Sequence, residues 1–188
     1  FAGPSFAQCR GPRDVGFALT FGAGLGSPEP TDIENTDCLV LIGAHLGENM
    51  HNLQVQEFAK AVERRIPIIV VDPRFSVAAS KAKYWLPIKP GTDLALLLAW
   101  MNVLVSEGRY DQAFVAKYGH GFDKFAAEIK AYTPEWAATE TGIDANLIRV
   151  TAREFASHRP ATIVHPGRRV NWYGDDAQRS RAVALLNA

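Results

Sequence analysis

The sequence predicts an α/β fold built on a doubly wound, mainly parallel sheet with a peripheral helical group. Two uninterrupted apolar runs, residues 38–43 and 66–72, are typical of parallel strands covered on both faces. The segment between them, 53–64, carries apolar residues on one helical face, so the three segments form a right-handed strand–helix–strand unit. A third apolar run over 161–165, which follows a long helical region, predicts another core strand.

The composition is that of a globular chain with a sizeable core. Of 188 residues, 47% are hydrophobic and 21% are charged, and 20 basic residues balance 20 acidic ones. This balance excludes the basic surface typical of nucleic-acid binding and the polybasic face of a membrane-surface protein. The longest apolar run, 94–105, is interrupted by Asn102 and is shorter than the roughly 20 residues that cross a bilayer, so a buried helix is expected there and no membrane span.

Two regions are expected along the chain, a loop-rich lead-in over 1–37 and an α/β cofactor-binding domain over 38–188. The lead-in is rich in Gly and Pro, and only a short helix around 14–20 is expected in it. The sequence starts at Phe1 without an initiator Met and stops inside a helical pattern. We therefore expect a piece, truncated at both ends, of a larger multidomain enzyme.

The elements after the second strand follow from turn and cap residues. Two prolines favour an extended conformation over 85–93, ahead of a helix over 93–106. Thr133 and Asp144 are of the types that begin a helix, and Gly142 is of the type that ends one. The peripheral helices are accordingly expected at 110–118, 122–132, 133–142 and 144–157, with a last helix from about 176 onward.

The loops that follow the first two strands are expected to share one crevice, because ligands of doubly wound sheets bind beyond the carboxyl ends of the strands. In the loop 43–49, small residues leave backbone N–H groups open to an anionic phosphate at the start of a helix. Asp72 ends the second strand, where such folds place an acceptor for ribose hydroxyls, and the carboxylate of Asp93 can accept both donors of a guanine edge. Each feature also has an ordinary structural interpretation, as a tight turn, a strand end and a helix N-terminus.

Three stretches carry a resemblance to a known family. They are Val71-Asp-Pro-Arg74, residues 82–97 with Pro90-Gly-Thr-Asp93 inside them, and Tyr132-Thr-Pro-Glu-Trp-Ala137. Over essentially its whole length the chain resembles the molybdopterin oxidoreductases of the dimethyl-sulfoxide-reductase type. The resemblance implies a cofactor of molybdenum held by two pterin dithiolenes, each with a guanosine diphosphate tail: molybdenum bis(molybdopterin guanine dinucleotide).

The resemblance also implies where one guanosine tail would lie. The residues expected at the pyrophosphate are Gly43, His45, Glu48 and Asn49; those at the ribose and base are Asp72 and Arg74; those at the guanine are Gly91 and Asp93. A 4Fe-4S cluster is expected in the full-length protein, on a run of cysteines that this sequence lacks.

Cys9 takes the place of the protein ligand to molybdenum in this resemblance. A soft thiolate suits a metal already bound by sulfur, and Arg10 and Arg13 nearby would favour the deprotonated form. The alternatives are a free cysteine or a disulfide with Cys38, which begins an apolar strand and is expected to be inert. Arg168 matches a basic position near the metal, where it would stabilise negative charge on an anionic substrate.

Other residues at and after the end of the third predicted strand are weaker candidates for the site. Arg169 is as well explained by a solvated surface position as by a role at the metal. His165 and Trp172 are secondary candidates for the substrate pocket, and both residue types are also common in protein cores.

Subfamily motifs favour a reductase of inorganic sulfur compounds in anaerobic respiration. Residues 27–30, 34–37 and 171–179 resemble the catalytic subunits of polysulfide and thiosulfate reductases, whose scaffold arsenate and tetrathionate reductases share. The resemblance implies an iron–sulfur subunit and a membrane quinol-oxidising subunit as partners, on the periplasmic face of the cytoplasmic membrane.

Two other classes of protein are kept as alternatives. A metal-free scaffold domain of a respiratory complex would share the fold and would need no ligand at position 9. A nicotinamide dehydrogenase is disfavoured because no Gly-x-Gly-x-x-Gly follows the first strand.

Overall fold

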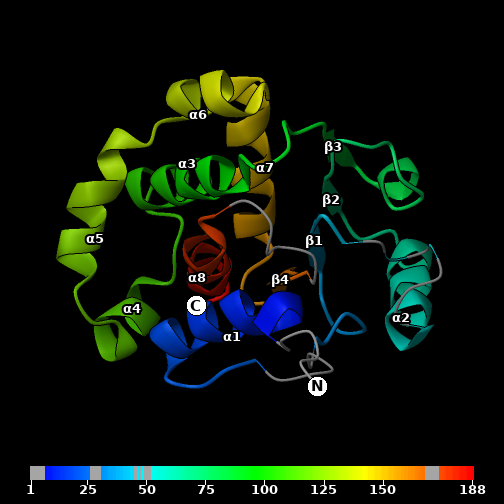
Figure 1. Ribbon diagram of the computed structural model, residues 1–188, viewed down its shortest axis with the longest axis horizontal. Helices are drawn as coiled ribbons and strands as arrows, with labels where there is room; N and C mark the ends of the chain where they lie inside the picture. Colours follow the sequence, from blue (N-terminus) through cyan, green and yellow to red (C-terminus); the bar gives the residue numbers. More distant parts are fainter. Residues whose placement is uncertain (1–6, 26–30, 45, 47, 49–51, 168–173) are drawn as a thin grey trace, which may run out of the picture.

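The computed structural model of the chain describes residues 7–25, 31–44, 46, 48, 52–167 and 174–188. Within these ranges four strands form one parallel sheet in the order β3-β2-β1-β4 (Figure 1). The strands are β1 (Cys38–Ile42), β2 (Ile68–Val71), β3 (Tyr84–Leu86) and β4 (Thr162–Val164). The predicted α/β fold with a parallel sheet is therefore confirmed.

Both faces of the sheet are buried, as the uninterrupted apolar runs predict. Alternate residues of β1 point to opposite sides: Val40 packs into the larger core cluster and Leu41 into the smaller one, and both are fully buried. The smaller cluster lies under α2 (Asn52–Glu63), which packs on one side of the sheet in Figure 1. The larger cluster lies under the remaining helices.

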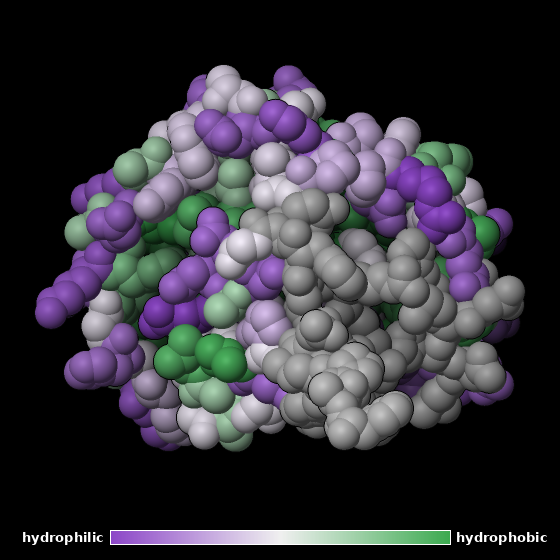
Figure 2. All heavy atoms as spheres, viewed as in Figure 1, coloured by the Kyte–Doolittle hydropathy of each residue, from purple (hydrophilic) through white to green (hydrophobic). Residues whose placement is uncertain are grey.

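These remaining helices cover the other face and its periphery (Figure 1). They are α1 (Ala7–Phe21), α3 (Asp93–Ser106), α4 (Gln112–Tyr118), α5 (Phe122–Glu128), α6 (Pro134–Thr141), α7 (Ala145–Ser157) and α8 (Asp176–Leu186), with the 3₁₀ turn η2 (Ile129–Ala131). The 3₁₀ turn η1 (Ala79–Lys81) lies on the side of α2, because Ala79 belongs to the smaller cluster. Hydrophobic residues are visible along α3 in Figure 2, whereas hydrophilic residues cover most of the other described surface on that side.

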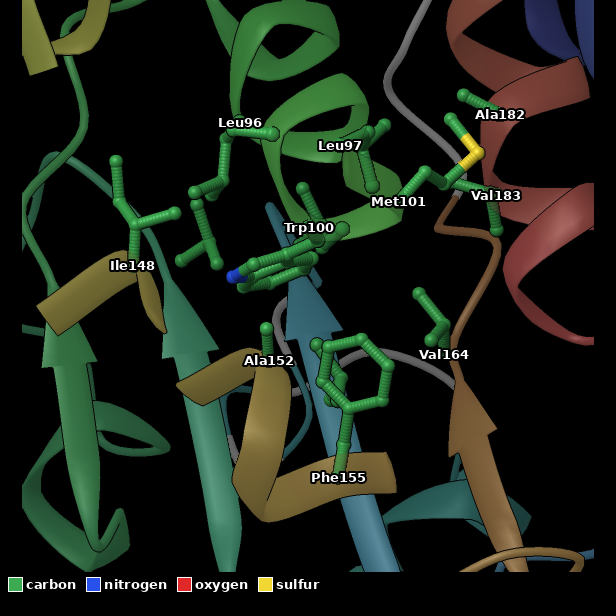
Figure 3. Packing of buried hydrophobic residues seen from close by; sticks show 14 of the residues in the cluster. Leu96, Leu97, Trp100, Met101, Ile148, Ala152, Phe155, Val164, Ala182 and Val183 are labelled. Atoms are coloured by element: carbon green, nitrogen blue, oxygen red, sulfur yellow. The ribbon is translucent and has the colours of Figure 1, made fainter. Parts of the chain in front are cut away.

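The centre of the larger cluster is Trp100 of α3, whose side chain is fully buried. Its ring meets the ring of Phe155 edge to face at 5.3 Å between centroids, and its Nε1 donates to Thr151 Oγ1 at 3.0 Å. Figure 3 shows Trp100 above the sheet, with Met101 reaching toward Ala182 and Val183 of α8. This packing fixes α3, α7 and α8 on the sheet, and thereby the loops at its carboxyl edge.

Two helices begin with the expected caps. The side chain of Thr133 accepts from the Trp136 N–H at the start of α6, and Asp144 accepts from the N–H groups of Asn146 and Leu147 at the start of α7. Gly142 ends α6 in the left-handed conformation, with φ of 76°.

The lead-in differs from the expectation of a short helix around 14–20, because α1 begins at Ala7 and includes Pro12. Contact with α8 explains the longer helix. Gly16 lies so close to α8 that a Cβ there would come within 2.5 Å of the Arg181 backbone nitrogen. Packing against a neighbouring helix stabilises a segment whose local sequence favours loops.

Candidate functional site

The loops after β1 and β2 are joined by one carboxylate, that of Glu48. Its Oε2 accepts from Arg74 Nη2 at 2.6 Å, and its Oε1 accepts from the backbone N–H of Val77 at 3.0 Å. Both loops leave the carboxyl edge of the sheet, and this carboxylate brings them into contact; that they line a crevice for a ligand stays a prediction. Glu48 and Arg74, both predicted for the nucleotide, thus also hold the walls of the crevice together.

Asp72 is fixed at the end of β2 with one carboxylate oxygen left over. Its Oδ1 accepts from the Arg74 backbone N–H at 2.8 Å, and its backbone oxygen accepts from Trp85 Nε1 at 2.9 Å. The residue is only 5% exposed, yet within the described part of the chain Oδ2 has no hydrogen-bond partner. An acceptor that is rigid and unused is suited to a hydroxyl of a bound sugar.

Gly43 opens the loop after β1 in the left-handed conformation, with φ of 59°. Its backbone N–H donates to Val71 O at 3.0 Å, which continues the sheet by one bond. Beyond its chain neighbours, no atom of the described residues lies within 4 Å of the position that a Cβ would occupy. Among these residues, the requirement for glycine is therefore conformational.

Asp93, the first residue of α3, follows the turn at Gly91, whose φ is 85°. Its Oδ2 lies 3.3 Å from Nε of Arg179 on α8, while Oδ1 has no hydrogen-bond partner in the described structure. Arg179 is 6% exposed, and burial lowers its pKa, an effect that the charge of Asp93 opposes. The sequence analysis missed this partner, because the pair joins residues 86 positions apart.

Cys9 belongs to α1, and the structure describes its backbone but not its side chain. Arg13 follows one helical turn later and is buried, with its Nη1 donating to the backbone oxygen of Gly167 at 3.3 Å. Gly167 directly precedes Arg168 in the loop after β4. The two segments predicted to flank the metal are therefore in contact through Arg13.

Several predicted residues lie outside the described ranges: His45, Asn49, Arg168, Arg169 and Trp172. His165 is described and has a structural role. It is 2% exposed, and its Nδ1 accepts from the Gly167 N–H at 3.0 Å, which shapes the loop ahead of Arg168.

Cys38 is fully buried in β1. Burial, with a smaller contribution from Glu154, raises the pKa of its thiol to about 12, so it stays protonated at neutral pH. The prediction of an inert Cys38 agrees with this environment, which leaves Cys9 as the cysteine suited to metal. Among the described residues, no group of three or more His, Cys, Asp or Glu side chains could hold a metal ion.

The described helices are all too short or too polar to cross a membrane.

Comparison with known proteins agrees with the resemblance drawn from the motifs. The sequence profile of the molybdopterin oxidoreductase family matches residues 7–186, nearly the whole chain. The chain belongs to this family. The predicted fold class and the predicted membership of the molybdopterin oxidoreductase family are thereby confirmed, and the family supports a molybdopterin cofactor.

Individual relatives differ in what they act on. The chain is 37% identical over 173 residues to the thiosulfate reductase molybdopterin-containing subunit PhsA of Salmonella typhimurium, covering 92% of this chain and 23% of that protein. It is 36% identical over 151 residues to the arsenate respiratory reductase molybdopterin-containing subunit ArrA of Chrysiogenes arsenatis, covering 68% and 17%.

A solved structure supports the fold. Acetylene hydratase from Pelobacter acetylenicus superposes with a TM-score of 0.88 at 30% identity, over 96% of this chain and 24% of that one. The chain thus spans about a quarter of the length of the relatives it matches, or less.

Proposed function

We propose that this chain forms one guanosine-binding half of the cofactor site in a molybdenum bis(molybdopterin guanine dinucleotide) reductase that acts on polysulfide or thiosulfate. The observation that supports the cofactor proposal is the state of two carboxylates at the carboxyl edge of the sheet. Asp72 and Asp93 each have one oxygen hydrogen-bonded within the protein and the other without a hydrogen-bond partner among the described residues. The similarity to PhsA favours an inorganic sulfur substrate.

The described residues fit a guanosine diphosphate tail. Gly43, beside which no described side chain lies, would let a pyrophosphate approach the backbone; Asp72 would offer an acceptor to ribose, and Asp93 would offer acceptors to the N–H donors of guanine. Glu48 and Arg74 would hold the two loops around the tail, and Gly91 provides the turn that presents Asp93. When bound, the molybdenum cofactor would supply the two-electron redox chemistry of the reaction.

Three contributions of this chain to the reaction follow. The crevice binds and orients the cofactor through one tail. Cys9 would supply a thiolate ligand from α1, whose Arg13 is tied to the loop after β4. Arg168, in that loop, would stabilise negative charge on an anionic sulfur substrate as a bond breaks.

Arsenate is the second candidate substrate, because the arsenate reductase subunit of Chrysiogenes arsenatis matches at nearly the same identity. We propose two partner subunits. An iron–sulfur subunit would exchange electrons with the 4Fe-4S cluster of the full-length protein, and a membrane subunit would oxidise quinol. The complex would lie on the periplasmic face of the membrane.

The test uses the intact protein. We expect molybdenum or tungsten near stoichiometry, and reduction of polysulfide or thiosulfate faster than of tetrathionate or arsenate with one artificial electron donor. A preference for arsenate would replace the substrate we propose. Absence of both metals from freshly purified protein would favour the metal-free scaffold instead.

The assignment of Cys9 is tested by Cys9→Ala and Cys9→Ser in the same protein. We expect Cys9→Ala to abolish turnover and to change the metal's X-ray absorption spectrum by loss of one sulfur neighbour. Cys38→Ala is the matched control, since its side chain is buried away from the crevice among apolar residues, and it should leave the spectrum unchanged. Full activity of Cys9→Ala would remove the assignment.

A further inference from the structure

The burial of Arg179 is not explained by a gain in the stability of the fold. The whole residue is 6% exposed, and Nε faces Asp93 Oδ2 at 3.3 Å. Its Nη1 is buried and has no hydrogen-bond partner in the part of the chain that the structure describes. A buried guanidinium with an unpaired donor opposes folding, and a buried ion pair is often no more stabilising than apolar residues of the same volume.

The position of Arg179 links it to the crevice. It lies in the first turn of α8, and Asp93 lies in the first turn of α3, so both helices begin at the carboxyl edge of the sheet. Asp176, one turn earlier on α8 and 8% exposed, acts on Arg179 through its charge but is not hydrogen-bonded to it. The one polar contact of the guanidinium among the described residues is therefore Asp93.

Holding one oxygen fixes the direction of the other. A carboxylate has about four acceptor positions, and Arg179 occupies one of them on Oδ2. The carboxylate side chain is 20% exposed, so it retains access to a ligand. Rotation about the side-chain bonds of Asp93 would break the contact with Nε, whereas an unpaired aspartate at a helix start would sample several rotamers.

We propose that Arg179 is a positioning residue for Asp93, which it holds in the orientation that accepts both N–H donors of guanine. The inference rests on the proposed function, because it takes Asp93 as the residue that reads the base. Selectivity follows from geometry: guanine presents a ring N–H and an amino group to the carboxylate, and hypoxanthine lacks the amino group. A carboxylate held in one orientation discriminates between the two bases better than a mobile one.

The test measures binding of free GDP and IDP to the intact protein purified from a host that makes no molybdopterin. Isothermal titration of the unsubstituted protein should show a preference for GDP of roughly tenfold or more, as expected for a hydrogen bond to a charged group. Arg179→Gln should weaken GDP about tenfold and IDP much less, so the selectivity ratio falls toward one. Loss of folded protein alone would lower the binding capacity for both nucleotides and leave their ratio unchanged.

Three further variants separate the possible outcomes. Arg179→Lys keeps the charge without the planar fork and should recover part of the selectivity. Asp93→Asn should abolish it. Arg153→Gln, which breaks an arginine–carboxylate pair with Glu107 on the surface, is the matched control and should change neither affinity.

Retention of the full GDP preference by Arg179→Gln and Arg179→Lys, while Asp93→Asn loses it, would overturn the positioning role and leave the proposed function intact. If Asp93→Asn also keeps the full GDP preference, or if the unsubstituted protein does not bind GDP, both the positioning role and the proposed function are contradicted.

Discussion

Asp72 and Asp93 solve one chemical problem in the same way. Each carboxylate uses one oxygen inside the protein, toward the Arg74 backbone in one case and Arg179 in the other, and the second has no hydrogen-bond partner among the described residues. A side chain with both oxygens free would be mobile, and one with both oxygens engaged would have fewer acceptor positions left for a ligand. The division between a holding oxygen and a binding oxygen makes single-atom substitutions informative.

Asp72→Asn is such a substitution. The amide oxygen can still accept from the Arg74 N–H, whereas the oxygen available to ribose becomes an NH₂ donor. We expect the cofactor tail to be held about 1.5–3 kcal/mol less tightly, the range for a hydrogen bond to a charged group. Guanine nucleotide released per purified protein would measure the loss.

The control for this change is Asp144→Asn, which alters the cap of α7 far from the crevice. Asn and Asp cap helices almost equally well, so nucleotide content should stay the same. Equal nucleotide content in the Asp72 and Asp144 variants would contradict the role of Asp72.

Cys38 gives a prediction about reactivity. Because burial raises the pKa of its thiol to about 12, iodoacetamide at pH 8 should leave Cys38 unmodified in the folded protein and modify it fully in denaturant. Peptide mass spectrometry measures the alkylation of Cys38 separately from that of all other cysteines. Rapid alkylation in the folded state would mean that the strand opens readily and that Cys38 is a possible second ligand.

At the scale of the elements, local signals predicted well. Thr133, Gly142 and Asp144 mark α6 and α7 because a cap depends on the residue and its own neighbouring N–H groups. The strand β1 was predicted because both faces of a parallel sheet must be apolar, which leaves an unbroken run in the sequence.

Non-local elements were harder to predict. The strand β3 is three residues long and pairs with β2, so periodicity could not separate it from an extended loop. The buried face of α2 contains the polar residue Gln54 beside Ala61, whereas Ala59 is exposed, which an apolar pattern alone does not predict. Among the site residues, Asp72 and Asp93 follow from the strand and turn pattern, but Arg179 required the packing of α3 against α8.

The contact between α1 and α8 depends on Gly16. A Cβ there would meet the backbone nitrogen of Arg181 at 2.5 Å, and backbone atoms cannot yield as a flexible side chain does. Gly16→Ala should therefore destabilise the packing by about 1–3 kcal/mol, despite the better helix propensity of alanine. The loss of packing should appear as faster amide hydrogen exchange over 176–186 in the intact Gly16→Ala protein than in the unsubstituted protein.

Gly24→Ala is the matched control, because its Cβ would come no closer than 3.5 Å to the side chain of Asp14. Its exchange rates should match those of the unsubstituted protein. If both variants exchange alike, the close approach at Gly16 does not hold α1 in place. Loss of molybdenum in the Gly16 variant alone would further connect α1 to the metal.

At the scale of the whole molecule, one edge of the sheet collects residues from distant parts of the sequence. Gly43, Asp72, Asp93 and Arg179 come from four segments that the parallel strands and their helices bring to the same side. Arg13 adds α1 to this edge through the loop after β4. The chain would therefore provide the nucleotide-binding wall of the larger site we propose, and the relatives, about four times as long, have room for the remainder.

The most direct test of this account is the nucleotide content of the intact purified protein. Acid hydrolysis followed by chromatography should release GMP, with molybdenum or tungsten present in the ratio expected for two guanine dinucleotides per metal, and Asp93→Asn should lower the GMP recovered. Release of CMP or of no nucleotide, with the metal present, would contradict the claim that the crevice beyond β1 and β2 holds a guanosine tail.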